Sequence, residues 1–355
     1  MRHLLKTRCP VHLVLPALLV LWFCPPGRAH AQAPAGAAGG KRINQEGRVL
    51  GPLPAITRPI VFNTPEADAV LSAMQIFPKD SAWNEDISKR PVLKESDSMI
   101  AHVGKDKHLA YNLDMGFIIV PSKQKPVPVK LTDYPDESDP GPYPVPDNAT
   151  IEGWPLEGGN LDTLQQAGAG DRHVIVVDPM NQKLYEFWRG FKKPGGWEAA
   201  NEATFDLSSN KLRPKGWTSS DAAGLPIFPA TVRFDEVDRG MVEHALRFTI
   251  QKSRAAFIYP ATHHAGKGND PTVPAMGQRF RLKTSADLAG LSKHALAIAK
   301  GLQKYGMIVA DNGGDWRISV APDARIQGLD GLRRFKGSDF EVIQTTGENE
   351  GPRQK

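Results

Sequence analysis

Residue types suited to chemistry gather in turn-rich segments of the second half of the chain. In the first segment, which runs from Arg213 to Pro226, Trp217 precedes three hydroxyl side chains and Asp221. An indole beside hydrogen-bonding groups suits a sugar, because the C–H face of a sugar stacks on the ring. An ordered turn, with Asp221 as a cap and Trp217 in the core, explains the same pattern. The sequence leaves both interpretations open.

The second segment, from Asp235 to Phe248, holds four acids, two arginines and one histidine at the start of an expected strand. Strand alternation would place Glu243 and Arg247 on one face and His244 on the other. A carboxylate and a guanidinium on one face form either a structural ion pair or part of a site, since both arrangements perturb the pKa. Glu236 adds a further carboxylate to this segment.

The third segment, from Val309 to Arg317, has Asp311 and Asp315 on either side of a Gly-Gly pair, with Trp316 next. A tight hairpin turn needs Asn and Gly for its dihedral angles, which explains the pattern structurally. Paired carboxylates beside an indole would instead serve hydrolysis, with a geometry set by their separation.

Two weaker signals complete the set. His263 and His264 lie in a loop, and adjacent histidines in an extended chain point apart, which disfavours a shared metal. His263 is either a general acid or base or a solvated loop residue. Arg279 and Arg281 alternate with apolar residues along one expected strand, which predicts a solvated cationic face or a clamp for an acidic polysaccharide.

No Gly-x-Ser-x-Gly, His-Glu-x-x-His or P-loop motif occurs, which argues against serine hydrolases of the α/β type, zincin proteases and nucleotide enzymes. The candidate catalytic residues are Asp221, Glu236, Glu243, His244, His263, Asp311 and Asp315. The candidate substrate-binding residues are Trp217, Arg247, Arg279, Arg281 and Trp316.

These residues must be positioned mainly by β-strands. Residues 171–178 and 183–188 are rich in β-branched and aromatic side chains and flank a Pro-Met-Asn-Gln turn, which predicts a hairpin. The same composition predicts further strands at 203–207, 230–235, 244–251, 256–259, 278–283, 307–310, 316–320 and 340–344.

Helical spacing is strong in only two places. Residues 66–76 follow Thr64 as N-cap and Pro65 at the first helical position. Residues 286–305 repeat apolar side chains at helical intervals between Ser285 and Gly306. Many short strands with one packed helix predict a mainly β chain, with a β-sandwich or jelly-roll-like core.

A proline-rich segment, residues 121–155, interrupts this pattern. Its nine prolines exclude regular ladders, so a long ordered loop is expected. Tyr134, Tyr143 and Trp154 supply aromatic anchors, which favours a functional loop over a linker. The acids of Asp133–Asp139 would suit a structural Ca²⁺, although their spacing matches no EF-hand; no other cofactor is indicated.

The N-terminal residues 1–31 have the basic start, short apolar middle and Ala29-His30-Ala31 end of a secretory signal peptide cleaved after Ala31. Both cysteines, Cys9 and Cys24, leave with it, so the expected mature protein has no disulfide. We expect a flexible leader at 32–59, one β-rich domain at 60–345 and a disordered tail at 346–355. The compartment would be the periplasm or the exterior.

Charge gives little guidance to partners. The chain has 44 Lys and Arg against 39 Asp and Glu, and the signal peptide accounts for four of the cations and none of the acids. The mature chain would therefore be nearly neutral, which gives no argument for nucleic acid or a membrane surface. No segment after the signal is apolar enough to span a bilayer.

Four segments resemble a family of secreted bacterial proteins of unsettled activity: Gly170–His173, Leu212–Pro226, His244–Phe248 and Lys304–Asn312. The likeness covers roughly residues 75 to 345. It implies export and a shared fold, and it assigns no catalytic residues.

These features favour a secreted carbohydrate-active enzyme, a glycoside hydrolase or a polysaccharide lyase, acting on an extracellular polysaccharide. A hydrolase would use two carboxylates, whereas a lyase would use His244 or His263 as base and Arg247 or Arg281 as a charge clamp. The alternative is a non-catalytic carbohydrate-binding or cell-envelope protein. Catalysis predicts that the ionisable groups converge in one cleft, and binding predicts a flat aromatic platform.

Overall fold

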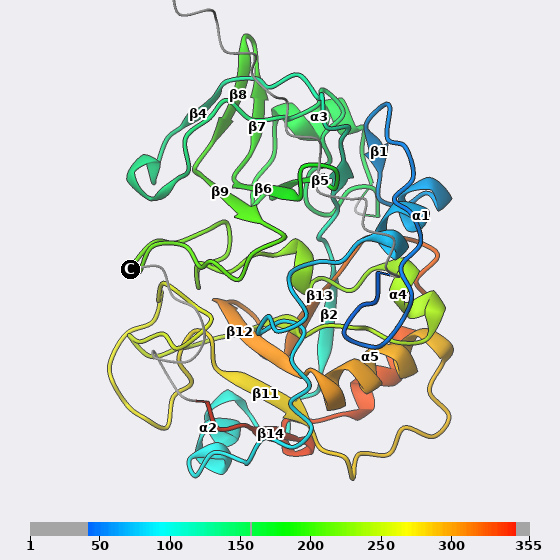
Figure 1. Ribbon diagram of the computed structural model, residues 1–355. Helices are drawn as coiled ribbons and strands as arrows, with labels where there is room; N and C mark the ends of the chain where they lie inside the picture. Colours follow the sequence, from blue (N-terminus) through cyan, green and yellow to red (C-terminus); the bar gives the residue numbers. More distant parts are fainter. Residues whose placement is uncertain (1–41, 157, 346–355) are drawn as a thin grey trace, which may run out of the picture. The chain divides into compact units, whose positions relative to one another are not determined.

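The computed structural model describes residues 42–156 and 158–345 (Figure 1). The expected signal peptide, the first part of the expected leader and the expected tail lie outside these residues. The described chain is mainly β with few helices, and its strands form three mixed sheets, none of which closes into a barrel. The predicted mainly β class is thus confirmed, while the sandwich or jelly-roll arrangement stays a prediction.

The first sheet has five strands, and its centre is the predicted hairpin. In this hairpin Val174 pairs with Phe187 and Val176 with Tyr185 in antiparallel register. The order across the sheet is β1 (Ile60–Val61), β3 (Ile118–Ile119), β5 (Val174–Asp178), β6 (Lys183–Trp188) and β9 (Asn201–Asp206).

The second sheet has six strands and carries four of the twelve predicted site residues, Arg247, Arg279, Arg281 and Asp311. Strand β10 pairs in parallel with β12 and antiparallel with β13, and β13 pairs in parallel with β2. The order is β14 (Phe340–Val342), β11 (Arg279–Leu282), β12 (Met307–Asn312), β10 (Leu246–Ile250), β13 (Arg317–Val320) and β2 (Ala110–Leu113).

The third sheet corrects one expectation about the proline-rich loop. Its order is β4 (Val129–Leu131), β8 (Gly196–Ala199) and β7 (Phe191–Lys193). Strand β4 lies inside residues 121–155, where no regular ladder was expected. The residues between Pro128 and Pro135 contain no proline, and this window suffices for a short edge strand parallel to β8.

Two predicted helices form, and both end up shorter than predicted. Helix α1 (Pro65–Ala73) begins as predicted, with the Thr64 side chain accepting from the Ala67 N–H. Helix α5 (Lys293–Lys304) is shorter than predicted and is capped by Ser292 rather than Ser285. Gly290 lies at φ +71°, a left-handed conformation that cannot continue a helix, so residues 286–291 stay outside it. The remaining helices are α2 (Ser96–Val103), α3 (Leu161–Gln166) and α4 (Phe234–Arg239), with 3₁₀ turns η1 (Pro135–Glu137), η2 (Phe228–Ala230), η3 (Leu329–Arg334) and η4 (Gly337–Asp339).

The strand predicted at 230–235 is wrong, because η2 and α4 occupy half of it and Val232 makes only one bridge, to Val320. Ion pairs from Arg233 to Glu236 and from Asp235 to Arg239 have the spacing that favours a helical turn. The strand predicted at 256–259 is reduced to a bridge between Phe257 and Met276.

Strand β5 lies between two hydrophobic cores, which explains its uninterrupted apolar sequence. Ile175 and Val177 face the larger core, which includes the apolar side of the six-stranded sheet. Val174 and Val176 face a smaller core together with Tyr143 of the proline-rich loop. A strand buried on both faces has no polar side, so it shows no alternation in sequence.

The described part of the expected leader, residues 42–59, is not a free spacer. Ile43 and Val49 form a β-bridge, and Leu50 is buried. Arg48 forms an ion pair with Glu243, 195 residues further along the chain. Polar contacts of this kind leave no hydrophobic periodicity, so they could not be predicted from the sequence. Among the described residues, no helix has the length and apolar character to cross a membrane.

Candidate functional site

Four neighbouring strands of the six-stranded sheet align polar side chains on one face. On β10, Phe248 faces the core, so Arg247 and Thr249 project from the opposite face. Thr249 pairs with Asp311 of β12 and with Arg317 of β13. An irregularity in register between Phe248 and Thr249 brings Asp311, rather than Ala310, opposite Thr249, which is how a bulge redirects a side chain.

The polar side chains on this face continue onto β13 and β2. Ser319 of β13 pairs with Asn112 of β2, and Asp114 follows two residues later. Arg317 Nη1 donates to the side-chain oxygen Oδ1 of Asn112 at 3.0 Å, which places both side chains on this face. We call Asn112, Asp114, Glu152, His173, Asp221, Arg247, Asp311 and Ser319 the sheet-face cluster.

The centre of this cluster is a buried ion pair. Arg247 donates from Nε and Nη2 to the two carboxylate oxygens of Asp221, each at 2.7 Å. Its Nη1 donates to Ser319 Oγ at 2.5 Å. Asp221 is fully buried and Arg247 nearly so. The two parallel hydrogen bonds fix the plane of the guanidinium and balance the buried charge.

The turn that carries Asp221 is held by hydroxyl groups. Ser219 Oγ donates to the backbone oxygens of Asp221 and Leu225 at 2.8 and 2.6 Å. Thr262 Oγ1 donates to the Trp217 oxygen at 2.9 Å, and it lies so close to Gly224 that a Cβ there would meet it at 2.0 Å. The hydroxyl groups therefore build the turn, but the Asp221 carboxylate binds Arg247 rather than capping the turn, and Trp217 is half-buried rather than in the core.

Two half-buried carboxyls, Asp114 and Asp311, flank this ion pair. Burial and the nearby Asp221 charge raise the pKa of Asp311 to about 7. Burial and the nearby Glu152 raise the pKa of Asp114 to about 6. The positive charge of Arg247 acts on both carboxyls and partly opposes this rise in their pKa values. Carboxyls with pKa values near neutrality next to an ion-paired carboxylate are typical of acid–base sites.

The end of the proline-rich loop brings in a second charged pair. His173 Nδ1 lies 3.0 Å from Glu152 Oε2, and its Nε2 lies 3.0 Å from the Ser220 oxygen. Although burial opposes it, the Glu152 carboxylate raises the pKa of His173 to about 9. The loop is tied to β2 because the Gly153 N–H donates to the Asp114 oxygen at 2.8 Å.

Glu186, on β6, lies behind the Asp221 turn and is fully buried. It accepts from the Ile227 and Phe228 N–H groups at 2.9 and 2.8 Å. Burial raises its pKa to about 7, and the Asp221 charge adds to this. Glu186 therefore anchors the start of η2 from the neighbouring sheet.

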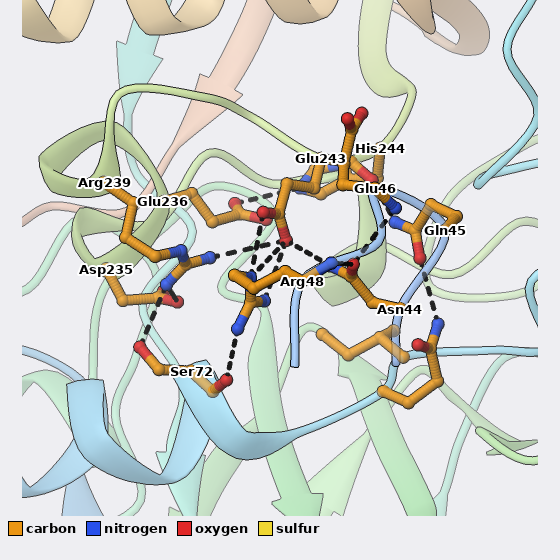
Figure 2. Close-up of polar contacts among 12 residues, drawn as sticks. Asn44, Gln45, Glu46, Arg48, Ser72, Asp235, Glu236, Arg239, Glu243 and His244 are labelled. Atoms are coloured by element: carbon orange, nitrogen blue, oxygen red, sulfur yellow. Dashed lines mark hydrogen bonds and ion pairs between the residues drawn. The ribbon is translucent and has the colours of Figure 1, made fainter. Parts of the chain in front are cut away.

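Glu236, Glu243 and His244 lie in a different place (Figure 2). His244 Nε2 is 3.0 Å from Glu236 Oε2, and Arg233 donates to Glu236 Oε1 at 2.7 Å. Glu243 pairs with Arg48 rather than with Arg247, so the predicted same-face pair of Glu243 and Arg247 is wrong. Strand β10 begins only at Leu246, so alternation does not extend back to Glu243. We call Arg48, Asp235, Glu236, Arg239, Glu243 and His244 the strap cluster.

Three predicted substrate-binding residues are structural. Trp316 is fully buried, and its ring stacks against Phe248 at 6.0 Å between centroids. Arg279 and Arg281 are buried and donate to backbone oxygens, Arg279 to Tyr305 and Arg281 to Ile87. The predicted solvated cationic face is therefore wrong: these side chains bind loops that cover their side of the sheet.

The remaining candidates lie at the edges. Asp315 forms an ion pair with exposed Lys107 and accepts from the Gln251 N–H at 2.7 Å, which makes it part of the turn. His263 Nδ1 lies 2.7 Å from the Ala222 oxygen, next to the Asp221 turn. Trp217 is half-buried, with the Arg213 guanidinium 5.5 Å from its ring centroid.

Of the three segments expected to meet, the structure joins Asp221, Arg247 and Asp311, whereas His244, Asp315 and Trp316 point elsewhere. Sequence reasoning missed Asp114, Glu152, His173 and Glu186. Two signals were present: Asp114 directly follows a strand, and Glu152 belongs to the loop whose aromatic anchors favoured function. Neither signal says that 114 and 311 share a face.

Within the described ranges, 42–156 and 158–345, no group of three or more His, Asp or Glu residues is arranged to hold a metal ion. In the loop considered for Ca²⁺, Asp139 pairs with Arg213 at 2.5 Å. Glu137 accepts from the Thr218 N–H at 2.8 Å. Comparisons of the chain with protein-family models, with curated proteins and with solved structures found no match.

Proposed function

We propose that the chain is an exported carbohydrate-active enzyme, most specifically a glycoside hydrolase, and that the sheet-face cluster is its catalytic centre. The observation that carries this proposal is the pair of half-buried carboxyls, Asp311 and Asp114, on either side of the Arg247–Asp221 ion pair. Glycoside hydrolysis requires two carboxyl groups in different protonation states near neutral pH.

The higher pKa assigns the acid. Asp311, with a pKa of about 7, holds its proton near neutral pH and transfers it to the glycosidic oxygen as the bond to the anomeric carbon breaks. Asp114, with a pKa of about 6, is then ionised and serves as nucleophile or as the base for water. One oxygen of Asp114, Oδ1, is buried and accepts no hydrogen bond from the described residues.

Arg247 and the Glu152–His173 pair tune this chemistry without touching the substrate bond. The fixed guanidinium limits how far the pKa values of Asp311 and Asp114 rise, whereas the Glu152 carboxylate raises that of Asp114. A lyase is less well supported. His244 is bonded to Glu236, and Arg281 and Arg247 are occupied by Glu341 and Asp221.

The rival is a non-catalytic carbohydrate-binding protein, and one surface favours it. Tyr134 is 43% exposed, with its ring centroid 6.1 Å from that of half-buried Trp188. Arg189 lies 5.6 Å from the Trp188 ring centroid. Such a pair would stack on a sugar ring. Trp83, Trp197 and Trp316 are buried and supply no platform.

The test is turnover on a panel of neutral and acidic polysaccharides, measured as release of reducing ends by the mature chain. Asp311→Asn and Asp114→Asn should each lower turnover by about 10²-fold or more, the size of an acid–base contribution. The wild-type rate should fall above pH about 7, where Asp311 loses its proton, and below pH about 6, where Asp114 gains one.

Asp136→Asn, at an exposed acid of the proline-rich loop, is the matched control and should leave turnover unchanged. Unfolding midpoints of all variants should be compared, because a lost fold would imitate lost catalysis. Binding of a polysaccharide without turnover, abolished by Tyr134→Ala and untouched by Asp311→Asn, would favour the rival.

A further inference from the structure

The strap cluster contains a binding site for a guanidinium group, and Arg48, from a distant part of the chain, occupies it. Arg48 donates from Nε and Nη2 to Glu243 at 3.0 and 2.8 Å. Its Nη1 donates to the Ser72 oxygen at 2.7 Å (Figure 2). Asn44 donates to Glu243 Oε2 at 2.8 Å as well. Planar carboxylate contacts plus a carbonyl acceptor are what a guanidinium requires and an ammonium does not.

Arg48 also balances the charge of this cluster. Three carboxyl side chains, those of Asp235, Glu236 and Glu243, meet two arginines from their own segment, Arg233 and Arg239. Arg48 supplies the third cation, so its departure would leave an acidic pocket. Although burial opposes it, the Arg233 guanidinium lowers the pKa of Glu236 to about 2, so this carboxylate stays charged.

The pocket beneath residues 42–50 holds a small cavity and a carboxylate oxygen without a hydrogen-bond partner among the described residues. Its cavity measures about 30 Å³, enough for about one water molecule, and Arg48, Asp235, Glu236 and His244 line it. Asp235 is 5% exposed, and its Oδ1 accepts no hydrogen bond from the described residues. Arg233 Nε lies 3.9 Å from this oxygen, beyond hydrogen-bond distance, so the oxygen can accept from a further donor.

Residues 42–50, which we call the strap, have the contacts of a detachable unit. Inside it, the Asn44 side chain accepts from the Glu46 and Arg48 N–H groups, and Ile43 bridges Val49. Ile43 and Val49 are 38% and 55% exposed, so these apolar side chains do not hold it to the domain. Apart from buried Leu50, the strap is held by polar contacts.

Solvent reaches one side of the strap. A groove of about 770 Å³ lies between Ile43 and Gly47 of the strap and the segment that carries Asp80 and Asp86. On the other side, Glu46 pairs with Lys304 at 2.8 Å and accepts from the Tyr305 hydroxyl. Few apolar contacts and an open flank are the properties of segments that open locally.

We propose that the strap is releasable, that the pocket formed by Glu243, Glu236 and Asp235 is a guanidinium site filled in cis by Arg48, and that release exposes the Glu236–His244 pair. The ligand class is a guanidinium compound, including an arginine side chain. His244 Nδ1 lies 2.8 Å from the Ala245 oxygen and its Nε2 lies 3.0 Å from Glu236, so both ring nitrogens face acceptors while the strap is closed. The proposal does not depend on the sheet-face cluster.

The experiment compares the reactivity of His244 in the mature wild type and in Arg48→Ala. Diethyl pyrocarbonate would modify histidines, and mass spectrometry of peptides would give a rate for each one. We expect the His244 rate to rise about tenfold or more in Arg48→Ala, because His244 is 5% exposed under the strap. Agmatine, a guanidinium compound, should restore protection at millimolar concentration, and choline should not.

Two controls separate strap opening from general loosening. His263, which lies outside the strap cluster, should react at the same rate in both proteins. Arg58→Ala, which removes an exposed ion pair to Glu66, should leave the His244 rate unchanged. Equal His244 rates in wild type and Arg48→Ala, a parallel rise at His263, or no protection by agmatine would each overturn the proposal.

If Arg48→Ala does not fold, amide hydrogen exchange of the wild type decides. The N–H groups of residues 42–50 should then exchange together and faster than those of β10. Exchange of the strap only at the rate of global unfolding would overturn the proposal.

Discussion

The sheet-face cluster and the strap cluster use the same residue types and differ in how their charges are satisfied. In the sheet-face cluster one carboxylate, Asp221, takes up the arginine, and Asp311 and Asp114 remain half-buried with raised pKa values. In the strap cluster each carboxyl contacts at least one arginine; the pKa of Glu236 is lowered to about 2, whereas burial and the Glu236 charge raise that of Asp235.

This difference teaches that proximity of acids and a histidine does not by itself make a site. An excess of carboxyls over cations leaves groups that exchange protons near neutral pH, which suits chemistry. A set in which every carboxyl pairs with an arginine has its charges balanced, which suits structure. The strap cluster would have an excess of carboxyls over arginines, like the sheet-face cluster, only if Arg48 were removed.

The largest expected effect comes from the central ion pair. Arg247→Ala would leave Asp221 charged and fully buried without its partner, so we expect a loss of about 3–5 kcal/mol in unfolding free energy. Arg48→Ala should cost less, because Glu243 keeps its ion pair with Arg239 and is exposed to solvent once the strap opens. Urea unfolding at pH 7 would measure both. An equal loss in the two variants would break the distinction between the clusters.

A smaller, pH-dependent effect should distinguish the two histidine–carboxylate pairs. The folded pKa of His173, about 9, lies above its ordinary value of 6.5. Protonated His173 therefore stabilises the fold fully below pH about 6.5, and this contribution is lost as the pH rises through about 9. Glu152→Gln should remove this slope, worth on the order of 1–3 kcal/mol.

Glu236→Gln is the matched control for this slope. The pKa of Glu236 lies below its ordinary value of 4.5, so its contribution is present above that pH and is lost only as the pH falls through about 2. Its cost should be the same at pH 7 and pH 9.5. Unfolding free energies at the two pH values would test both variants, and a wild type that shows no slope there would contradict the prediction.

The smallest effect is expected at the edge of the sheet-face cluster. Lys107 pairs with Asp315 at 2.5 Å, but the lysine side chain is 55% exposed. An exposed ion pair contributes little, so Lys107→Ala should change the unfolding free energy by less than about 1 kcal/mol. Thermal unfolding at low and high salt would check this. A larger loss would mean that the Gly-Gly turn depends on this pair and belongs with the site.

Local sequence pattern was sufficient to predict several elements of the fold. The hairpin of β5 and β6 and the start of α1 follow from turn and capping residues that lie next to each other in sequence. The strand predicted at 230–235 failed because ion pairs within Arg233–Arg239 favour a helical turn. Apolar and charged residues alternate too briefly there to separate the two outcomes.

The candidate site was predictable only in part, because it depends on register between distant strands. Asp221, Arg247 and Asp311 were singled out by residue type, and they converge. Asp114 joins them because β2 pairs with β13 across about 200 residues. Trp316 was misassigned because an indole next to a turn has the same sequence whether it stacks on Phe248 or on a sugar.

The pairing of β2 with β13 also determines when the sheet-face cluster can assemble as the chain is synthesised. Asp114 belongs to the first third of the chain, yet its strand has its only sheet neighbour within the described residues at Arg317–Val320. A nascent chain that ends before Arg317 has no partner strand for β2 and no Ser319 for Arg247. Non-local pairings of this kind form late. The sheet-face cluster can therefore assemble only after the residues up to Val320 have been made.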